Sequence, residues 1–99
     1  MWQDRFTLHY NELKEMVLRA LSPAPMDSLM LFEELTRQGV GRLEIHAVRM
    51  ALVRYYKQGL LTRERKLGVF SYGISERGRR RLEWLESLHD AKTDQIERE

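Results

Sequence analysis

Apolar residues recur along the first third of the chain at helical spacing. Between Thr7 and Leu21 they repeat every three or four positions, which predicts a first helix with Thr7 or Asn11 as its N-cap. Two prolines in residues 22–25 end this helix, because proline lacks an amide hydrogen and pushes the preceding residue into extended geometry. The positions expected to be buried are Leu13, Met16, Val17, Ala20 and Leu21.

A second helix is predicted to begin after Asp27, whose carboxylate can accept hydrogen bonds from the free amides of the first turn. Gly39 ends it, and residues 39–41 are short enough to be the turn of a helix-turn-helix. Its expected buried stripe is Leu29, Leu31, Phe32 and Leu35.

The third predicted helix runs from Arg42 to Gln58, with Gly59 as its C-terminal stop. The apolar side of this helix is expected to consist of Ile45, Val48, Leu52 and Tyr55. The opposite side is polar and mostly basic.

The hydrophobic period then changes from that of a helix to that of a strand. Residues 60–65 and 69–74 are two short extended candidates, joined by a glycine-containing turn at 66–68, which together predict a hairpin. In the second strand, Phe70, Tyr72 and Ile74 alternate on one face, whereas Leu60 and Leu61 leave the inward face of the first strand open.

Ser75 is expected to cap a last helix with Leu82, Trp84, Leu85 and Leu88 as its apolar residues. The resulting domain covers residues 1–89, and residues 90–99 are expected to fray.

The 99-residue chain is 42% hydrophobic and 32% charged, as is typical of a globular protein. It has no cysteine, which excludes disulfides and cysteine-ligated metal sites. Its charged N-terminus and the absence of a long apolar run predict a cytoplasmic protein that does not bind membranes.

Charge is unevenly distributed along the sequence. Residues 37–81 contain twelve basic and three acidic residues, a local charge of +9, although the whole chain carries only +2. The flanking segments are acidic, so the pattern favours one surface that faces a polyanion. The alternative is that these side chains only solubilise exposed faces.

Two stretches carry a resemblance to a known family. Residues 48–61 read VRMALVRYYKQGLL, and residues 70–82 read FSYGISERGRRRL. They resemble the passage from recognition helix to wing, and the end of the wing, in winged helix-turn-helix transcription regulators of the PadR-like and MarR-like superfamily. Residues 27–32 lack the glycine-tyrosine element of many PadR-like proteins, which leaves the subfamily open.

The resemblance implies a mainly α fold with a small β-hairpin: a three-helix core, a two-stranded wing and a C-terminal helix. It also implies sequence-specific binding to double-stranded DNA, with helix 42–58 in the major groove and the wing at residues 60–74 on the backbone or in the minor groove. The residues expected to bind DNA are Arg42, Glu44, His46, Arg49, Met50, Arg63, Arg65, Lys66 and Arg77.

These residues have different expected roles. Arg42 and Arg49 can donate two parallel hydrogen bonds to guanine, and Glu44 can accept from cytosine or discourage wrong sequences. The charges of the wing can contact phosphates, with protection of an exposed strand edge as the alternative.

A homodimer is expected, because apolar residues outside the compact three-helix core can form a surface between subunits. A two-fold axis would then place two recognition helices on one palindrome. The apolar residues assigned to its interface are Trp2, Phe6, Tyr10, Trp84, Leu85 and Leu88. The three histidines fall on three different predicted elements and no catalytic motif is present, so we expect no enzymatic activity, no metal and no cofactor. The competing function is a winged-helix module that binds an acidic protein.

Overall fold

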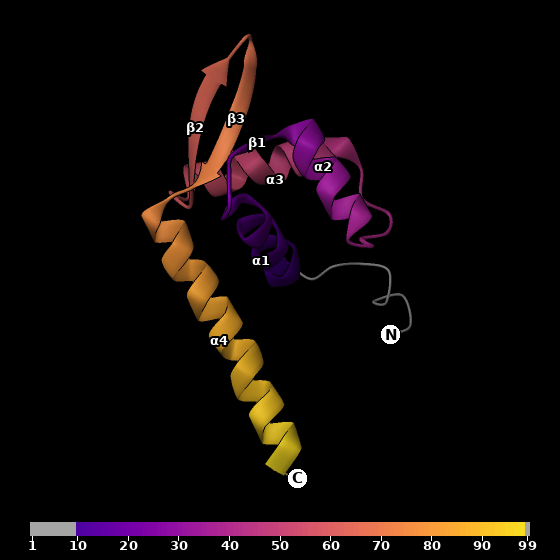
Figure 1. The fold of residues 1–99 in the computed structure, drawn as a ribbon, viewed down its shortest axis with the longest axis vertical. Helices are drawn as coiled ribbons and strands as arrows, with labels where there is room; N and C mark the ends of the chain where they lie inside the picture. Colours follow the sequence, from indigo (N-terminus) through magenta and orange to yellow (C-terminus); the bar gives the residue numbers. More distant parts are fainter. Residues whose placement is uncertain (1–9, 99) are drawn as a thin grey trace.

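Four helices and a three-stranded antiparallel sheet make up the part of the chain that the computed structural model describes, residues 10–98 (Figure 1). In chain order the elements are α1 (Tyr10–Leu21), β1 (Met26–Asp27), α2 (Ser28–Arg37), α3 (Ile45–Lys57), β2 (Leu61–Lys66), β3 (Val69–Ile74) and α4 (Glu76–Arg98). The described residues therefore form a small α+β domain. β1 lies between α1 and α2 in the chain, and β2 and β3 lie between α3 and α4.

One hydrophobic core joins the helices to the sheet. Among the predicted core positions, Val48, Leu52 and Tyr55 of α3 are fully buried, as expected. On α2, Leu31 and Leu35 are buried and Leu29 is exposed. The prediction for Leu29 is wrong because residues two positions apart on a helix point in nearly opposite directions, and Leu31 faces the core.

The ends of α2 agree with the sequence pattern. A carboxylate oxygen of Asp27 accepts a hydrogen bond from the Met30 amide at 2.8 Å, so this residue is the N-cap. Gly39 follows the helix with φ +94°, a conformation that glycine adopts without a Cβ clash. In α1, Asn11 lies at the second described position of the helix, and Thr7 lies outside the described residues.

The third helix is shorter than predicted. It begins at Ile45, and Arg42 lies in the preceding turn with φ +58°. Val40 and Leu43 on either side of this residue pack against the core, so the chain completes its reversal before the helix begins. Arg42 is therefore not a helical residue.

The sheet contains one strand more than predicted. β2 and β3 form the expected hairpin, with pairs from Leu61 opposite Ile74 to Lys66 opposite Val69. β1 pairs with the other edge of β3, which places β3 in the centre of the sheet. Because β1 has only two residues, it has no periodicity of its own, and its conformation comes from pairing with β3.

Three elements meet at Gly59 and Leu60, between α3 and β2. The Leu60 carbonyl accepts a hydrogen bond from the Ser75 amide at 3.0 Å, and the Ser75 hydroxyl donates to the Gly59 carbonyl at 2.6 Å. The same hydroxyl oxygen accepts from the Gly78 amide at 3.0 Å, which confirms Ser75 as the N-cap of α4. We call these four residues, Gly59, Leu60, Ser75 and Gly78, the junction.

The last helix continues to Arg98, and the fraying of residues 90–99 stays a prediction. Residues 79–98 contain no glycine or proline, and an established helix extends readily through such a sequence. The C-terminal half of α4 extends away from the rest of the molecule (Figure 1). Within residues 10–98, no helix combines the length and the apolar character needed to cross a bilayer.

Replacing Gly78 with alanine should destabilise the fold by about 1 to 3 kcal/mol, because a Cβ at this position would lie 2.1 Å from the Leu60 carbonyl oxygen. Gly41→Ala is the matched control, since no described heavy atom beyond the adjacent residues lies within 4 Å of a Cβ there. Urea unfolding followed by circular dichroism measures both variants. Equal stabilities would contradict the close approach at the junction.

Candidate nucleic-acid interface

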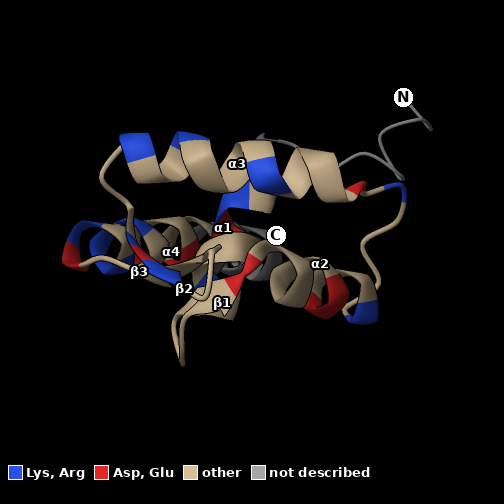
Figure 2. Cartoon of the chain, turned by 90° about the horizontal axis from the view of Figure 1, so that it is seen from above, with Lys and Arg blue, Asp and Glu red and all other residues tan. Residues whose placement is uncertain are grey.

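The exposed side of α3 is basic. Arg49, Arg54 and Lys57 lie on this helix, and its sequence contains no acidic residue (Figure 2). His46 and Met50 are also exposed. Because Val48, Leu52 and Tyr55 hold the opposite side in the core, the charged side has a fixed orientation.

A second basic element, the β2–β3 hairpin, turns one face toward α3. Side chains alternate along a strand, so Arg63, Arg65, Phe70 and Tyr72 share this face. The guanidinium carbon of Arg63 lies 4.2 Å from the ring centres of both Tyr56, on α3, and Phe70. We call this arrangement the arginine clamp. Its contact with Tyr56 ties the hairpin to α3, and its contact with Phe70 lies within the hairpin.

Arg65 lies farther out on the same face. It is opposite Phe70 in the strand register, and its guanidinium carbon is 5.5 Å from that ring centre. Lys66 belongs to the other face of the hairpin, where its ammonium nitrogen is 3.2 Å from a carboxylate oxygen of Glu64. Both partners are exposed, so this pair contributes little to stability.

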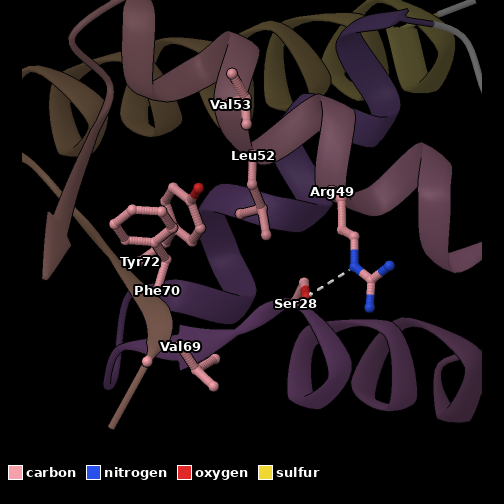
Figure 3. A pocket seen from close by; sticks show the side chains of 8 residues that line it. Ser28, Arg49, Leu52, Val53, Val69, Phe70 and Tyr72 are labelled. Carbon is pink, nitrogen blue, oxygen red and sulfur yellow. Dashed lines mark hydrogen bonds between the residues drawn. The ribbon is translucent and has the colours of Figure 1, made fainter. Parts of the chain in front are cut away.

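A groove of about 340 Å³ separates α3 from the hairpin (Figure 3). Arg49 reaches across one edge of the groove, where its Nε donates a hydrogen bond of 3.5 Å to the Ser28 hydroxyl. The residues that line it are Ser28, Arg49, Leu52, Val53, Gly68, Val69, Phe70 and Tyr72. One ligand lying over this groove could therefore touch α3 and the hairpin together.

The predicted DNA-binding residues near the start of α3 differ in their backbone positions. Glu44 occupies the N-cap position with extended backbone, and its side chain makes no capping hydrogen bond. His46 lies in the first turn of the helix. Arg42 precedes both, in the turn, so it does not share the helical spacing of Arg49 that the sequence predicted.

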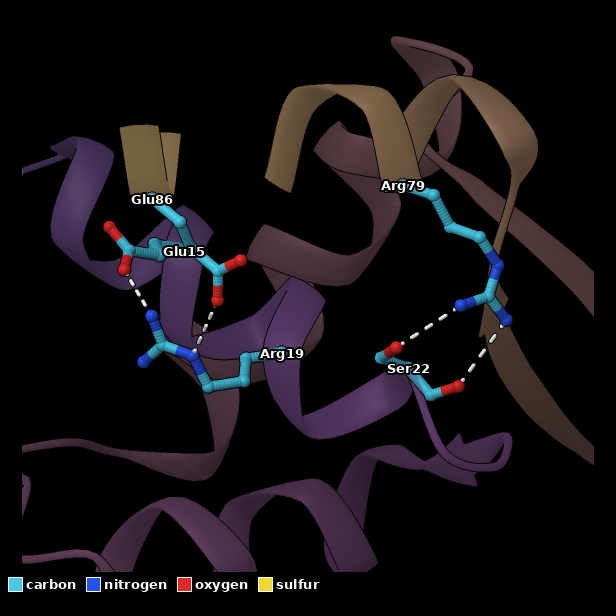
Figure 4. Close-up of polar contacts among 5 residues, drawn as sticks. All are labelled: Glu15, Arg19, Ser22, Arg79 and Glu86. Atoms are coloured by element: carbon cyan, nitrogen blue, oxygen red, sulfur yellow. Dashed lines mark hydrogen bonds and ion pairs between the residues drawn. The ribbon is translucent and has the colours of Figure 1, made fainter. Parts of the chain in front are cut away.

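The arginines of α4 form separate contacts. Arg79 donates to the hydroxyl and the carbonyl of Ser22 at 3.1 and 3.3 Å, which attaches α4 to the end of α1 (Figure 4). Arg77 packs over Gly59 and lines a shallow hollow with Arg80, Arg81 and Trp84. It thus groups with α4, whereas the sequence grouped it with the DNA-binding residues of α3 and the hairpin.

A further pair of contacts holds α4 against α1. Arg19 forms an ion pair with Glu15 on its own helix, and its Nε lies 3.3 Å from a carboxylate oxygen of Glu86 on α4 (Figure 4). Glu15 is buried, although no periodic pattern in the sequence marks it as a core residue. The first turns of α4 are therefore fixed relative to the helices that position α3.

The residues predicted to form a dimer interface differ in their exposure to solvent. Trp84 and Leu88 of α4 are 53% and 41% exposed. Leu85 is buried in the core of its own chain and is not available for such an interface, because it faces the body of the domain. Trp2, Phe6 and the side chain of Tyr10 lie outside the described residues.

Comparisons with known proteins add no family. No protein-family model matches the chain, and no curated protein matches it.

Sequence reasoning missed the part played by Tyr56 and Phe70 in positioning Arg63. Phe70, which alternates with Tyr72 and Ile74 on one face of its strand, is 39% exposed and packs on guanidinium groups. The alternation of Arg63 and Arg65 in one strand with Phe70 and Tyr72 in the next was a usable signal. It required the hairpin register, which depends on the length of the turn.

Replacing Arg63 with glutamine should lower the free energy of unfolding by about 1 kcal/mol, since it removes two cation–π contacts. Arg65→Gln is the control, with one longer contact to Phe70 and an expected loss below about 0.5 kcal/mol. Chemical denaturation of the two variants measures the difference. A larger loss for the control would show that the clamp does not hold the hairpin.

Proposed function

We propose that this protein is a winged helix-turn-helix transcription regulator that binds double-stranded DNA. In this proposal α3 lies in the major groove as the recognition helix, and the β2–β3 hairpin is the wing, which contacts the backbone or the minor groove. The function requires no catalytic group and no cofactor.

The observation that supports the proposal is the joint position of two basic elements of different kinds. Arg49 of α3 and Phe70 of the hairpin line the same groove, and Phe70 packs against Arg63 and Arg65. A duplex offers phosphates and base edges at the same time, so a rigid helix and a strand pair can contact both. The element order α1, β1, α2, α3, β2, β3 and α4 is compatible with the winged-helix architecture.

The two elements would contribute differently to binding. Arg49, His46 and Met50 occupy the first half of α3, the part of a recognition helix that reaches base edges. Arg63 and Arg65 would contact phosphates, which strengthens binding and sets the register without specifying a sequence. Arg42 and Glu44, at the approach to the helix, are proposed to contact DNA from the turn.

Arg49→Ala should weaken binding to the preferred duplex by about 5- to 150-fold, corresponding to about 1 to 3 kcal/mol, and should reduce discrimination against random sequence. Arg37→Ala is the control, because this substitution removes the same formal charge from the protein. Arg37 is an exposed residue of α2 that forms an ion pair with Glu34. Fluorescence anisotropy with duplexes selected from a random library measures both variants.

The salt dependence separates DNA binding from other functions. Wild-type affinity should fall steeply as salt rises, and Arg65→Ala should reduce the slope of log K against log salt by about one. Absence of duplex binding at low salt would contradict the proposal and favour an interaction module for an acidic protein.

We also propose that two copies associate through α4. Trp84 and Leu88 lie on one side of the helix, where each is only partly covered by the residues that the structure describes. A two-fold arrangement would place two α3 helices on successive major grooves, about 34 to 36 Å apart. The palindromic character of the selected DNA would follow from this symmetry.

Trp84→Glu should shift the protein from dimer to monomer in sedimentation velocity, because it places a charge in the proposed apolar contact. Leu29→Glu, at an exposed leucine of α2, is the control and should leave the distribution unchanged. A wild-type protein that sediments as a monomer at micromolar concentration would contradict the dimer, but it would leave the proposal of DNA binding intact.

A further inference from the structure

The tip of the β2–β3 hairpin is apolar and exposed. Leu67 is fully exposed, and Val69 beside it is 51% exposed. A single exposed leucine is common on a protein surface. This one differs because it stands at the end of a projecting hairpin, where none of residues 10–98 covers it (Figure 1).

The backbone at this position does not favour leucine. Leu67 and Gly68 form the two-residue turn, with φ values of +51° and +79°. Positive φ at both positions is typical of a type I′ turn, in which asparagine followed by glycine is preferred. A leucine there brings its Cβ close to the backbone and buries nothing in return. Neither the fold nor the core accounts for the residue, so its side chain points to a contact outside the chain.

The surroundings of the tip are basic. Arg63, Arg65 and Lys66 lie on β2, with Glu64 as the single acidic residue of the strand, and β3 carries no charge. The hairpin thus has an apolar tip, with basic side chains on the strand that leads to it. This arrangement is complementary to a ligand with a negative outer layer and an apolar interior. Duplex DNA has this character, because phosphates surround a stack of bases.

A lipid surface shares this chemistry, but the geometry favours DNA. Membrane attachment scales with the apolar area that is buried, and the tip offers only two aliphatic side chains. The groove lined by Arg49 extends to Gly68 and Val69, so the tip belongs to the same surface as the basic helix. The arginine clamp also holds the hairpin to α3, which allows the tip to push against a stiff ligand.

We propose that Leu67 is a wedge that enters the minor groove and partly unstacks one base step, so that the protein bends the DNA it binds. Leucine is among the side chains that act in this way in other DNA-bending proteins, with kinks of about 20 to 90°. The inference rests on the proposed duplex binding and adds a second form of sequence preference. A flexible pyrimidine–purine step opposite Leu67 would bind better than a stiff step, without any hydrogen bond to its bases.

The test uses the full chain and duplexes of about 30 bp that the protein selects from a random library. Energy transfer between dyes at the two ends reports bending, and anisotropy of the same duplex reports affinity. Wild-type protein should shorten the distance between the dyes. Leu67→Asn should remove this shortening and weaken binding by less than about tenfold, whereas Leu67→Phe should retain the bend.

The Tm of Leu67→Asn separates the wedge from a merely structural role of Leu67, because a structural role predicts that this variant lowers the Tm. Asparagine tolerates the left-handed conformation, so this variant should raise the Tm by about 2 to 6 °C while it loses the bend. Leu29→Asn is the matched control: it removes an exposed leucine from α2 and should leave the bend unchanged.

The outcomes distinguish the two proposals. Tight duplex binding with a bend that survives Leu67→Asn, or with no bend in the wild type, overturns the wedge and leaves DNA binding in place. Absence of duplex binding overturns both. In that case, sedimentation with vesicles that contain anionic lipid, using wild-type protein and Leu67→Asn, identifies whether the tip enters a membrane.

Discussion

The hydrogen bonds at the junction determine how the surfaces of this protein are oriented. The Leu60 carbonyl accepts from Ser75, and the Ser75 hydroxyl donates to Gly59, so the end of α3, the start of β2 and the start of α4 share one small polar cluster. Gly78 allows α4 to approach the Leu60 carbonyl more closely than any side chain would permit. A shift here would rotate the hairpin and α4 relative to α3, and both proposed contact surfaces would change.

The arginine clamp extends this rigidity to the hairpin. A two-stranded hairpin is marginally stable by itself, and here its base is supported by β1 and by the core, while Arg63 connects its outer part to Tyr56 of α3. The same guanidinium contributes positive charge to the groove side. One side chain thus serves both packing and electrostatics, which explains how a chain of 99 residues can present a rigid basic surface.

Much of the local structure was predictable because it depends on nearby residues. The caps at Asp27 and Ser75, the stop at Gly39 and the hairpin at 61–74 follow from side-chain chemistry within a few positions. Residues with weak local signals were predicted incorrectly. Arg42 sits in a turn that is completed by packing of its neighbours, and the orientation of Leu29 depends on which side of α2 meets the core. The basic segment and its division among three elements were visible in the sequence, but which of its side chains lie together on one surface was not.

The sequence by itself determined the helices, the hairpin, their caps and the concentration of positive charge in residues 37–81, because each depends on spacing and composition along the chain. Tertiary structure decided the pairing of β1 with β3, the burial of Leu85 and Glu15, the separation of Arg77 from the groove and the clamp around Arg63. These features involve residues that are distant in the chain. Their contacts depend on the register of the sheet and on the angles at which elements pack, and neither quantity is encoded in a local pattern.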